Sequence, residues 1–244
     1  MRSWVLVLAC TLAMAAGRPS FGEESLSAEM QTLILAAKAG DANAQLRVGS
    51  AYDTGRGAPR DGKAAMMWYR LSAEQGNAEA QNSVGSGLQA EKQYAEAMPW
   101  YERAAAQGNA LATNNLAYLY DQGLGVLQDR RKAFDLYARA ADLKSADAMW
   151  NIATMYASGQ LGKKDMFMAC VWADRAIRFA GSADRKLLDR ASAALTHLQQ
   201  VLRNEQYLNC LQQAEAWSPS DAGTKLGIDP GSAMTPTTPA VSGK

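Results

Sequence analysis

Histidine is nearly absent from this 244-residue sequence, which contains one, His197. Metal sites built from histidine, alone or with cysteine, are therefore unsupported, because they need several such ligands. Net charge is also nearly absent, at a formal +1, so nothing in the composition points to nucleic acid or to an anionic membrane surface. Alanine is abundant and β-branched residues are sparse, which favours helix.

Catalytic motifs are missing as well. No serine lies in a nucleophile elbow. A Ser-His-Asp triad stays open, because its members can lie far apart in the chain. His197, however, sits beside Leu198 in a strongly periodic helical segment, where a structural role is the simpler interpretation. We therefore expect a protein that is not an enzyme and needs no cofactor or metal.

A long apolar run occurs only near the N-terminus, and it is too short to span a bilayer. Met1-Arg2 is a basic start, residues 4–16 are nearly all apolar, and small-residue cleavage motifs follow. This pattern is typical of a secretory signal peptide, residues 1–22, with cleavage between Ala15 and Glu23. It predicts a periplasmic or secreted protein with no stable membrane insertion after cleavage. A retained anchor and a lipid on Cys10 are the alternatives.

The central part of the sequence repeats itself. Successive units begin near residues 40, 76, 108 and 144, at spacings of 36, 32 and 36 residues. The segment "DTGRGAPRD" (53–61) returns as "DQGLGVLQD" (121–129) with Arg56 replaced by Leu124, which favours an interhelical turn over a phosphate-binding loop. The second unit lacks four residues of this turn, a loss that loops tolerate.

Each unit predicts two helices. Small and aliphatic residues recur every four positions in the first helix, as Ala44 and Val48 do. Glycines end that helix, and Asp61, Asp129 and Asp165 are positioned to cap the second. One column of the second helices holds Trp68, Trp100 and Trp172, which we expect to be buried.

These columns resemble the Sel-1-like repeat family, which is related to the tetratricopeptide repeats. The segment "ATNNLAYLYDQGLGVLQDRRKAFDLYARAA" (112–141) follows the family pattern almost throughout, and the resemblance covers about residues 41–180. It implies an all-α fold, a right-handed α-solenoid of antiparallel helix pairs that displays surfaces to protein partners. Some secreted members have been described as penicillin-binding or β-lactamase-like, but this sequence has no S-x-x-K frame.

The predicted organisation has five parts. They are a signal peptide (1–22), an N-terminal capping helix (23–40), four repeats (41–181), a C-terminal capping helical hairpin (182–217) and a disordered tail (218–244) rich in Pro, Gly, Ser and Thr. Cys170 and Cys210 form a possible disulfide that would attach the hairpin to the fourth repeat. Two buried thiols that never meet are the alternative.

A partner surface is predicted on the first helices, which line the concave face of related solenoids. Residues one position before the core columns point away from the core and form an amide-rich stripe with one aromatic anchor. The stripe consists of Arg47, Ser50, Glu79, Ser83, Ser86, Asn115, Tyr118, Asp147, Asn151 and Thr154. Bonds of its asparagines to neighbouring helices are the competing interpretation.

The function that we expect is a non-catalytic scaffold of the cell envelope that binds a protein or peptide partner. It would act in assembly, signalling or regulation. An envelope hydrolase of penicillin-binding or β-lactamase-like type and a structural part of an export or secretion apparatus are the alternatives.

Overall fold

The computed structural model describes residues 26–217, and in this range the chain forms helices and no strands. The predicted signal peptide and C-terminal tail lie outside the described residues. The helices are α1 (Ala28–Lys38), α2 (Ala42–Thr54), α3 (Gly62–Glu74), α4 (Ala78–Ala90), α5 (Tyr94–Ala106), α6 (Ala110–Gln122), α7 (Arg130–Asp142), α8 (Ala146–Ser158), α9 (Met166–Phe179), α10 (Arg185–Val201) and α11 (Asn204–Glu215).

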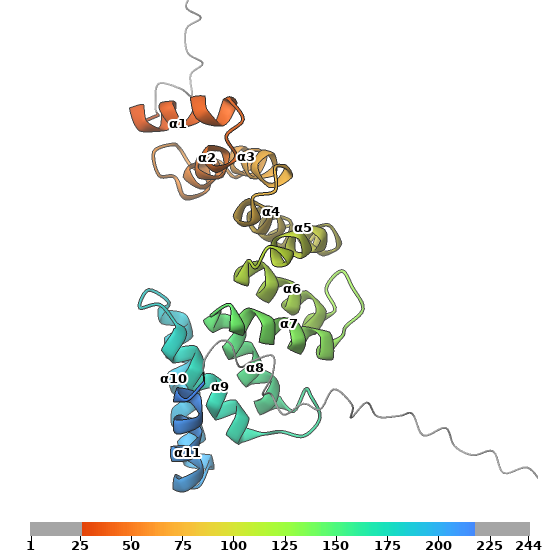
Figure 1. The fold of residues 1–244 in the computed structure, drawn as a ribbon, viewed down its shortest axis with the longest axis vertical. Coiled ribbons are helices and arrows are strands. Elements are labelled where there is room, and N and C mark those ends of the chain that lie inside the picture. The colour runs from red at the N-terminus through yellow and green to blue at the C-terminus, as the bar shows by residue number, and fades with distance from the viewer. Residues whose placement is uncertain (1–25, 218–244) are drawn as a thin grey trace, which may run out of the picture.

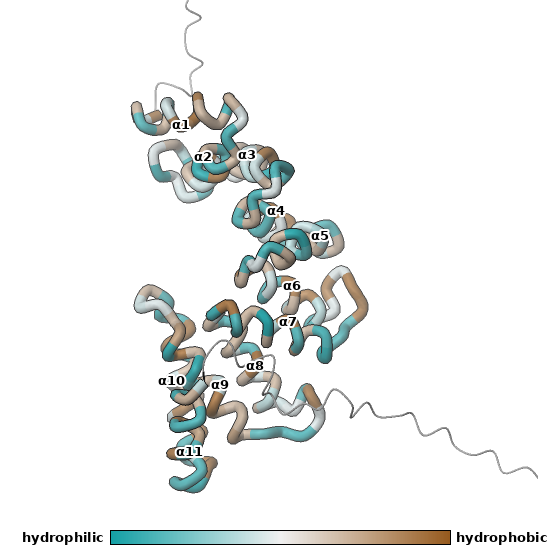
Figure 2. The backbone as a smooth tube through the Cα atoms, in the orientation of Figure 1, coloured by the Kyte–Doolittle hydropathy of each residue, from teal (hydrophilic) through white to brown (hydrophobic). Residues whose placement is uncertain are grey.

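Four helix pairs form the body of the molecule. The pairs α2/α3, α4/α5, α6/α7 and α8/α9 stack on one another along the chain (Figure 1). Apolar and polar residues alternate along the helices (Figure 2), as expected for helices that have one buried and one exposed side. The fold is the right-handed α-solenoid of antiparallel helix pairs that the sequence predicts.

Local signals in the sequence explain the helix boundaries. Asp61, Asp129 and Asp165 each accept hydrogen bonds from first-turn N–H groups of α3, α7 and α9, as predicted. The first helices α2, α4, α6 and α8 are capped in the same way by Asp41, Asn77, Asn109 and Ser145. α2, α6 and α8 end at glycines in the left-handed conformation.

In the first two pairs the core depends on a close contact between a tyrosine and a glycine. Tyr101 of α5 is fully buried, and a Cβ added to Gly85 of α4 would lie 2.7 Å from its ring. Gly49 stands in the same relation to Tyr69 in the pair before. These two glycines are required by the approach of the rings, because any side chain there would displace a tyrosine.

The tryptophan column is less uniform than predicted. Trp68 and Trp172 are buried, but Trp100 is only half-buried, so the prediction is wrong for that residue. In α5 the deepest position belongs to Tyr101, one residue later. Trp100 is left at the edge, where the Arg103 guanidinium covers its ring at 4.9 Å.

Buried glutamines join successive repeats. Gln45 and Gln81 are each about 95% buried and donate through Nε2 to the main-chain oxygens of Ala37 and Ala73, at 3.0 and 3.1 Å. Gln107 in turn donates to the Gln81 side chain at 2.8 Å. A buried amide without such partners would cost free energy, so these bonds fix the register of one pair on the next.

The two ends of the stack are closed differently. α1 packs on α2 through Met30 and Ala37. At the other end α10 and α11 both pack on α9 and touch each other little, so the predicted hairpin packing is wrong. The extended backbone at Leu202 separates the two helices, and each turns its apolar side to α9.

Candidate functional site

The predicted stripe lies on α2, α4, α6 and α8, and we name the surface that these four helices form the first-helix face. None of the ten stripe residues is buried. Ser83, Asn115, Asp147 and Asn151 are half-buried, and the other six are exposed. The position of the stripe outside the core is therefore as expected, whereas its role in binding stays a prediction.

The asparagines of this face are engaged between repeats. Asn115 Nδ2 of α6 donates to Asn82 Oδ1 of α4 at 3.2 Å. Asn151 Nδ2 of α8 donates to Asn114 Oδ1 of α6 at 3.0 Å. These amides hold neighbouring first helices together, so they are less free for a peptide backbone than the stripe alone suggests.

Several hydroxyl groups of the stripe are engaged too. Ser83 Oγ and Thr154 Oγ1 donate to main-chain oxygens of their own helices, and Ser86 Oγ accepts from the Tyr101 hydroxyl. The Asp147 carboxyl has a raised pKa, because of burial first and the nearby Asp184 second.

An apolar patch remains at the middle of the face. Tyr118 is 40% exposed and Leu111 is 55% exposed. The two residues are seven positions apart on α6, so they lie on the same side of that helix. An exposed tyrosine beside an exposed leucine is suited to contact with another protein.

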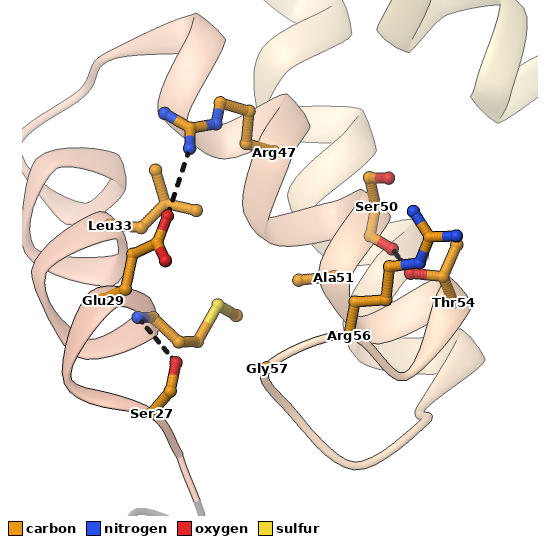
Figure 3. Close-up of a pocket in the computed structure, with 10 residues that line it drawn as sticks. Ser27, Glu29, Leu33, Arg47, Ser50, Ala51, Thr54, Arg56 and Gly57 are labelled. Carbon is orange, nitrogen blue, oxygen red and sulfur yellow. Dashed lines mark hydrogen bonds and ion pairs between the residues drawn. The ribbon is translucent and has the colours of Figure 1, made fainter.

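A first recess of about 530 Å³ opens between α1, α2 and the turn that follows α2. Figure 3 shows that Arg47, Ser50 and Thr54 reach it from α2. Glu29 and Leu33 face them from α1. The Arg47–Glu29 ion pair is 3.8 Å long and both side chains are exposed. It contributes little stability and leaves the guanidinium available to a ligand.

A second recess, of about 1120 Å³, lies between the start of α3 and the second half of α4. It combines the stripe residues Ser83 and Ser86 with the rim charges Arg60, Lys63 and Glu91. Sequence reasoning missed these rim residues. The signal that could have found them is the spacing of 32 residues in the second repeat, because it shortens the connection between α4 and α5.

The structure joins Cys170 of α9 to Cys210 of α11 in a disulfide, with their Cα atoms 6.1 Å apart. Both cysteines are fully buried. Beside them Arg175 is 95% buried, and its guanidinium lies 4.6 Å from the Trp172 ring and 5.0 Å from the Trp217 ring. Burial lowers the Arg175 pKa to about 10. This cluster attaches the C-terminal helices to the stack.

Between residues 26 and 217 no group of three or more His, Cys, Asp or Glu residues could hold a metal ion. His197 is exposed on α10. None of the helices from α1 to α11 is long and apolar enough to cross a membrane.

Comparison with known proteins agrees with the fold. The Sel1 repeat matches residues 42–77, 78–109, 110–145 and 146–178. A Sel1 repeat protein from Oxalobacter formigenes is 29% identical, with a TM-score of 0.65 over 76% of this chain and 75% of its own. No curated protein sequence matches the chain.

A protective antigen of uropathogenic Escherichia coli strains, which displays an SLR fold, is 25% identical with a TM-score of 0.68. The match covers 86% of this chain but 45% of the antigen, so the chain spans less than half of that protein's length. The four consecutive repeats cover more than half of the chain and coincide with the helix pairs α2/α3 to α8/α9. The chain therefore belongs to the Sel1 repeat family.

Proposed function

We propose that this protein is a non-catalytic scaffold of the cell envelope that binds a protein or peptide partner on its first-helix face. The observation that carries the proposal is the surface itself. Two recesses and the exposed pair Leu111 and Tyr118 occur along helices whose asparagine side chains are engaged in holding repeats together. A surface that offers shape and apolar contact, without a catalytic group, is suited to recognition.

Two observations support the envelope location. The first residues have the pattern of a secretory leader. The disulfide between Cys170 and Cys210 is a bond that persists in oxidising compartments such as the periplasm and is rare in the cytosol. Fractionation of cells and mass spectrometry of the mature N-terminus test this part. A chain that starts at Met1 in the cytosol would contradict it.

The binding surface is tested by site-specific photo-crosslinking in envelope extract. A photoreactive residue replaces Tyr118 on the first-helix face, and in a matched control it replaces Met67, which is 52% exposed on the second helix α3. We expect one crosslinked species from position 118 and none from position 67.

The purified partner is then titrated against Tyr118→Ala. Removal of an exposed aromatic anchor is expected to weaken binding about tenfold or more. Circular dichroism confirms that the variant is folded. Equal crosslinking from both positions, or unchanged affinity of the folded variant, would place the partner elsewhere.

A further inference from the structure

The two recesses lie at equivalent places in two successive repeats. The first is formed by the start of α1 and the second half of α2, and the second by the start of α3 and the second half of α4. α1 relates to α2 as α3 does to α4, because Gln45 binds the main chain of α1 in the way that Gln81 binds that of α3. Ser50 lines the first recess, and its repeat equivalent Ser86 lines the second. The recesses therefore form a row along the first-helix face, one repeat apart.

Tyr118 of α6 continues this row. It is the equivalent of Ser50 and Ser86 in the third repeat, and it is 40% exposed. The turn that follows α6 packs on the start of α5, since a Cβ added to Gly125 would lie 2.5 Å from the main-chain nitrogen of Ala95. The third position of the row therefore offers an exposed aromatic ring.

The first recess is suited to a carboxylate. Its lining has two guanidinium groups, from Arg47 and Arg56, and one carboxylate, from Glu29. Figure 3 shows the two arginines on opposite sides of the recess. Arg56 forms no ion pair within residues 26–217, and the only one of Arg47 is the long, exposed contact with Glu29. Ser27, the N-cap of α1, also lines the recess, so the positive end of that helix adds to the attraction for an anion.

The second recess is suited to an apolar side chain. The end of the Met66 side chain fills the space beside Gly87 and forms an apolar wall, and Ala90 is exposed at the rim. The charged residues of the lining are Asp53, Arg60, Asp61, Lys63 and Glu91. Acidic groups outnumber basic ones there, so a second carboxylate is not favoured.

The spacing of the row matches an extended peptide. Asn77 of α4 donates to Asn43 of α2 at 3.1 Å. Asn115 of α6 donates to Asn82 of α4 at 3.2 Å. Neighbouring first helices are thus in direct contact, and packed helices lie about 10 Å apart. An extended chain advances about 3.3 Å per residue, so about three residues cover one step of the row.

We propose that the first-helix face binds an extended peptide through every third side chain. An acidic residue enters the first recess, an apolar residue three positions away enters the second recess, and a further apolar residue three positions beyond contacts Tyr118. This inference rests on the proposed function and specifies the partner by its sequence pattern.

The test is selection of random twelve-residue peptides, displayed on phage, against the purified chain from Glu23 to Lys244. We expect the enriched peptides to carry one acidic and two apolar residues at intervals of three, in either chain direction. A synthetic peptide of the enriched sequence is then titrated by fluorescence anisotropy. Moving one apolar residue by a single position should weaken its binding about tenfold, because that side chain then points away from the recess.

Protein variants test each recess separately. Arg47→Glu/Arg56→Glu should weaken the peptide about tenfold or more, and a peptide with lysine in place of its acidic residue should bind this variant better than it binds the wild type. Ala90→Lys places a charge at the apolar recess and should weaken the peptide about tenfold. Arg70→Glu is the matched control on the second helix α3, where the residue is exposed, and it should change nothing. Circular dichroism confirms that each variant is folded.

A selection without binders, or binders without the three-residue interval, would overturn the inference. So would binding that is unchanged in both Arg47→Glu/Arg56→Glu and Ala90→Lys. In each of these cases crosslinking from position 118 would still support the proposed function, so the two failures are distinguishable.

Discussion

Adjacent aromatic residues of α5 should differ sharply in their contribution to stability. Tyr101 is fully buried; its hydroxyl donates to Gln89 Oε1 at 2.9 Å and lies 3.3 Å from Ser86 Oγ. Truncation of a buried aromatic side chain costs about 3–5 kcal/mol. The hydroxyl group accounts for about 1 kcal/mol of that. We therefore expect Tyr101→Ala to lower the free energy of unfolding by about 4 kcal/mol, and Tyr101→Phe by about 1 kcal/mol.

Trp100 is the matched comparison, because it is larger but only half-buried. Because one edge of Trp100 is exposed and the other contacts of its ring include the Arg103 guanidinium, truncation removes less buried apolar area. We therefore expect Trp100→Ala to lower the free energy of unfolding by about 2 kcal/mol. Urea unfolding followed by circular dichroism measures the three variants. Because repeat arrays can unfold in parts, hydrogen exchange in α4 and α5 provides a local reading.

The comparison of the free-energy losses of Tyr101→Ala and Trp100→Ala tests the described orientation of α5. A Trp100→Ala variant that loses as much stability as Tyr101→Ala would mean that α5 is rotated by about one residue, or 100°, from the arrangement described. The Gly85 contact with the Tyr101 ring would then also be wrong.

Three further outcomes follow from the same structure. Gly85→Ala should destabilise the protein by about 1–3 kcal/mol because its Cβ meets the Tyr101 ring, whereas Gly181→Ala, with open space around it, should be nearly neutral in the same urea titration. The disulfide joins positions 40 residues apart, so its removal by Cys210→Ser should cost about 4 kcal/mol and increase exchange in α11; two maleimide-reactive thiols in denatured, unreduced protein would show that the bond is absent. Burial, with Asp121 as a smaller cause, raises the pKa of Tyr137 above its usual 10, so the unfolded chain releases this proton first and stability should fall as pH rises above about 10. Tyr137→Phe should make that loss shallower in alkaline melts, and an unchanged slope would contradict the assignment.

Helix boundaries were predictable because their signals are local. Asp61, Asp129 and Asp165 cap helices through bonds to residues two or three positions away, and glycines end helices through their own backbone conformation. The packing of Tyr101 against Gly85 was not predictable in the same way. It depends on which ring of two neighbours enters the space above Gly85, and that choice is made by the facing helix.

The candidate surface was predictable in position but not in chemistry. Helical phase alone places Tyr118 and Arg47 outside the core, as the structure has them. The partners of Asn115 and Asn151 come from the preceding repeat, more than 30 residues away, so their engagement could not be read from phase. Cys170 and Cys210 are likewise 40 residues apart, so the sequence alone did not decide whether they are bonded.

The attachment of α11 to α9 gives the unfolding of this protein a direction. At the C-terminal end a covalent bond and the Arg175 guanidinium, which packs against the rings of Trp172 and Trp217, hold the last helix. At the N-terminal end α1 has only Met30 and Ala37 fully buried and no covalent link. In a stack where each pair depends on its neighbours, a protease or a pulling force should therefore open the array from α1 onward, and the fourth repeat should be the last to lose its structure.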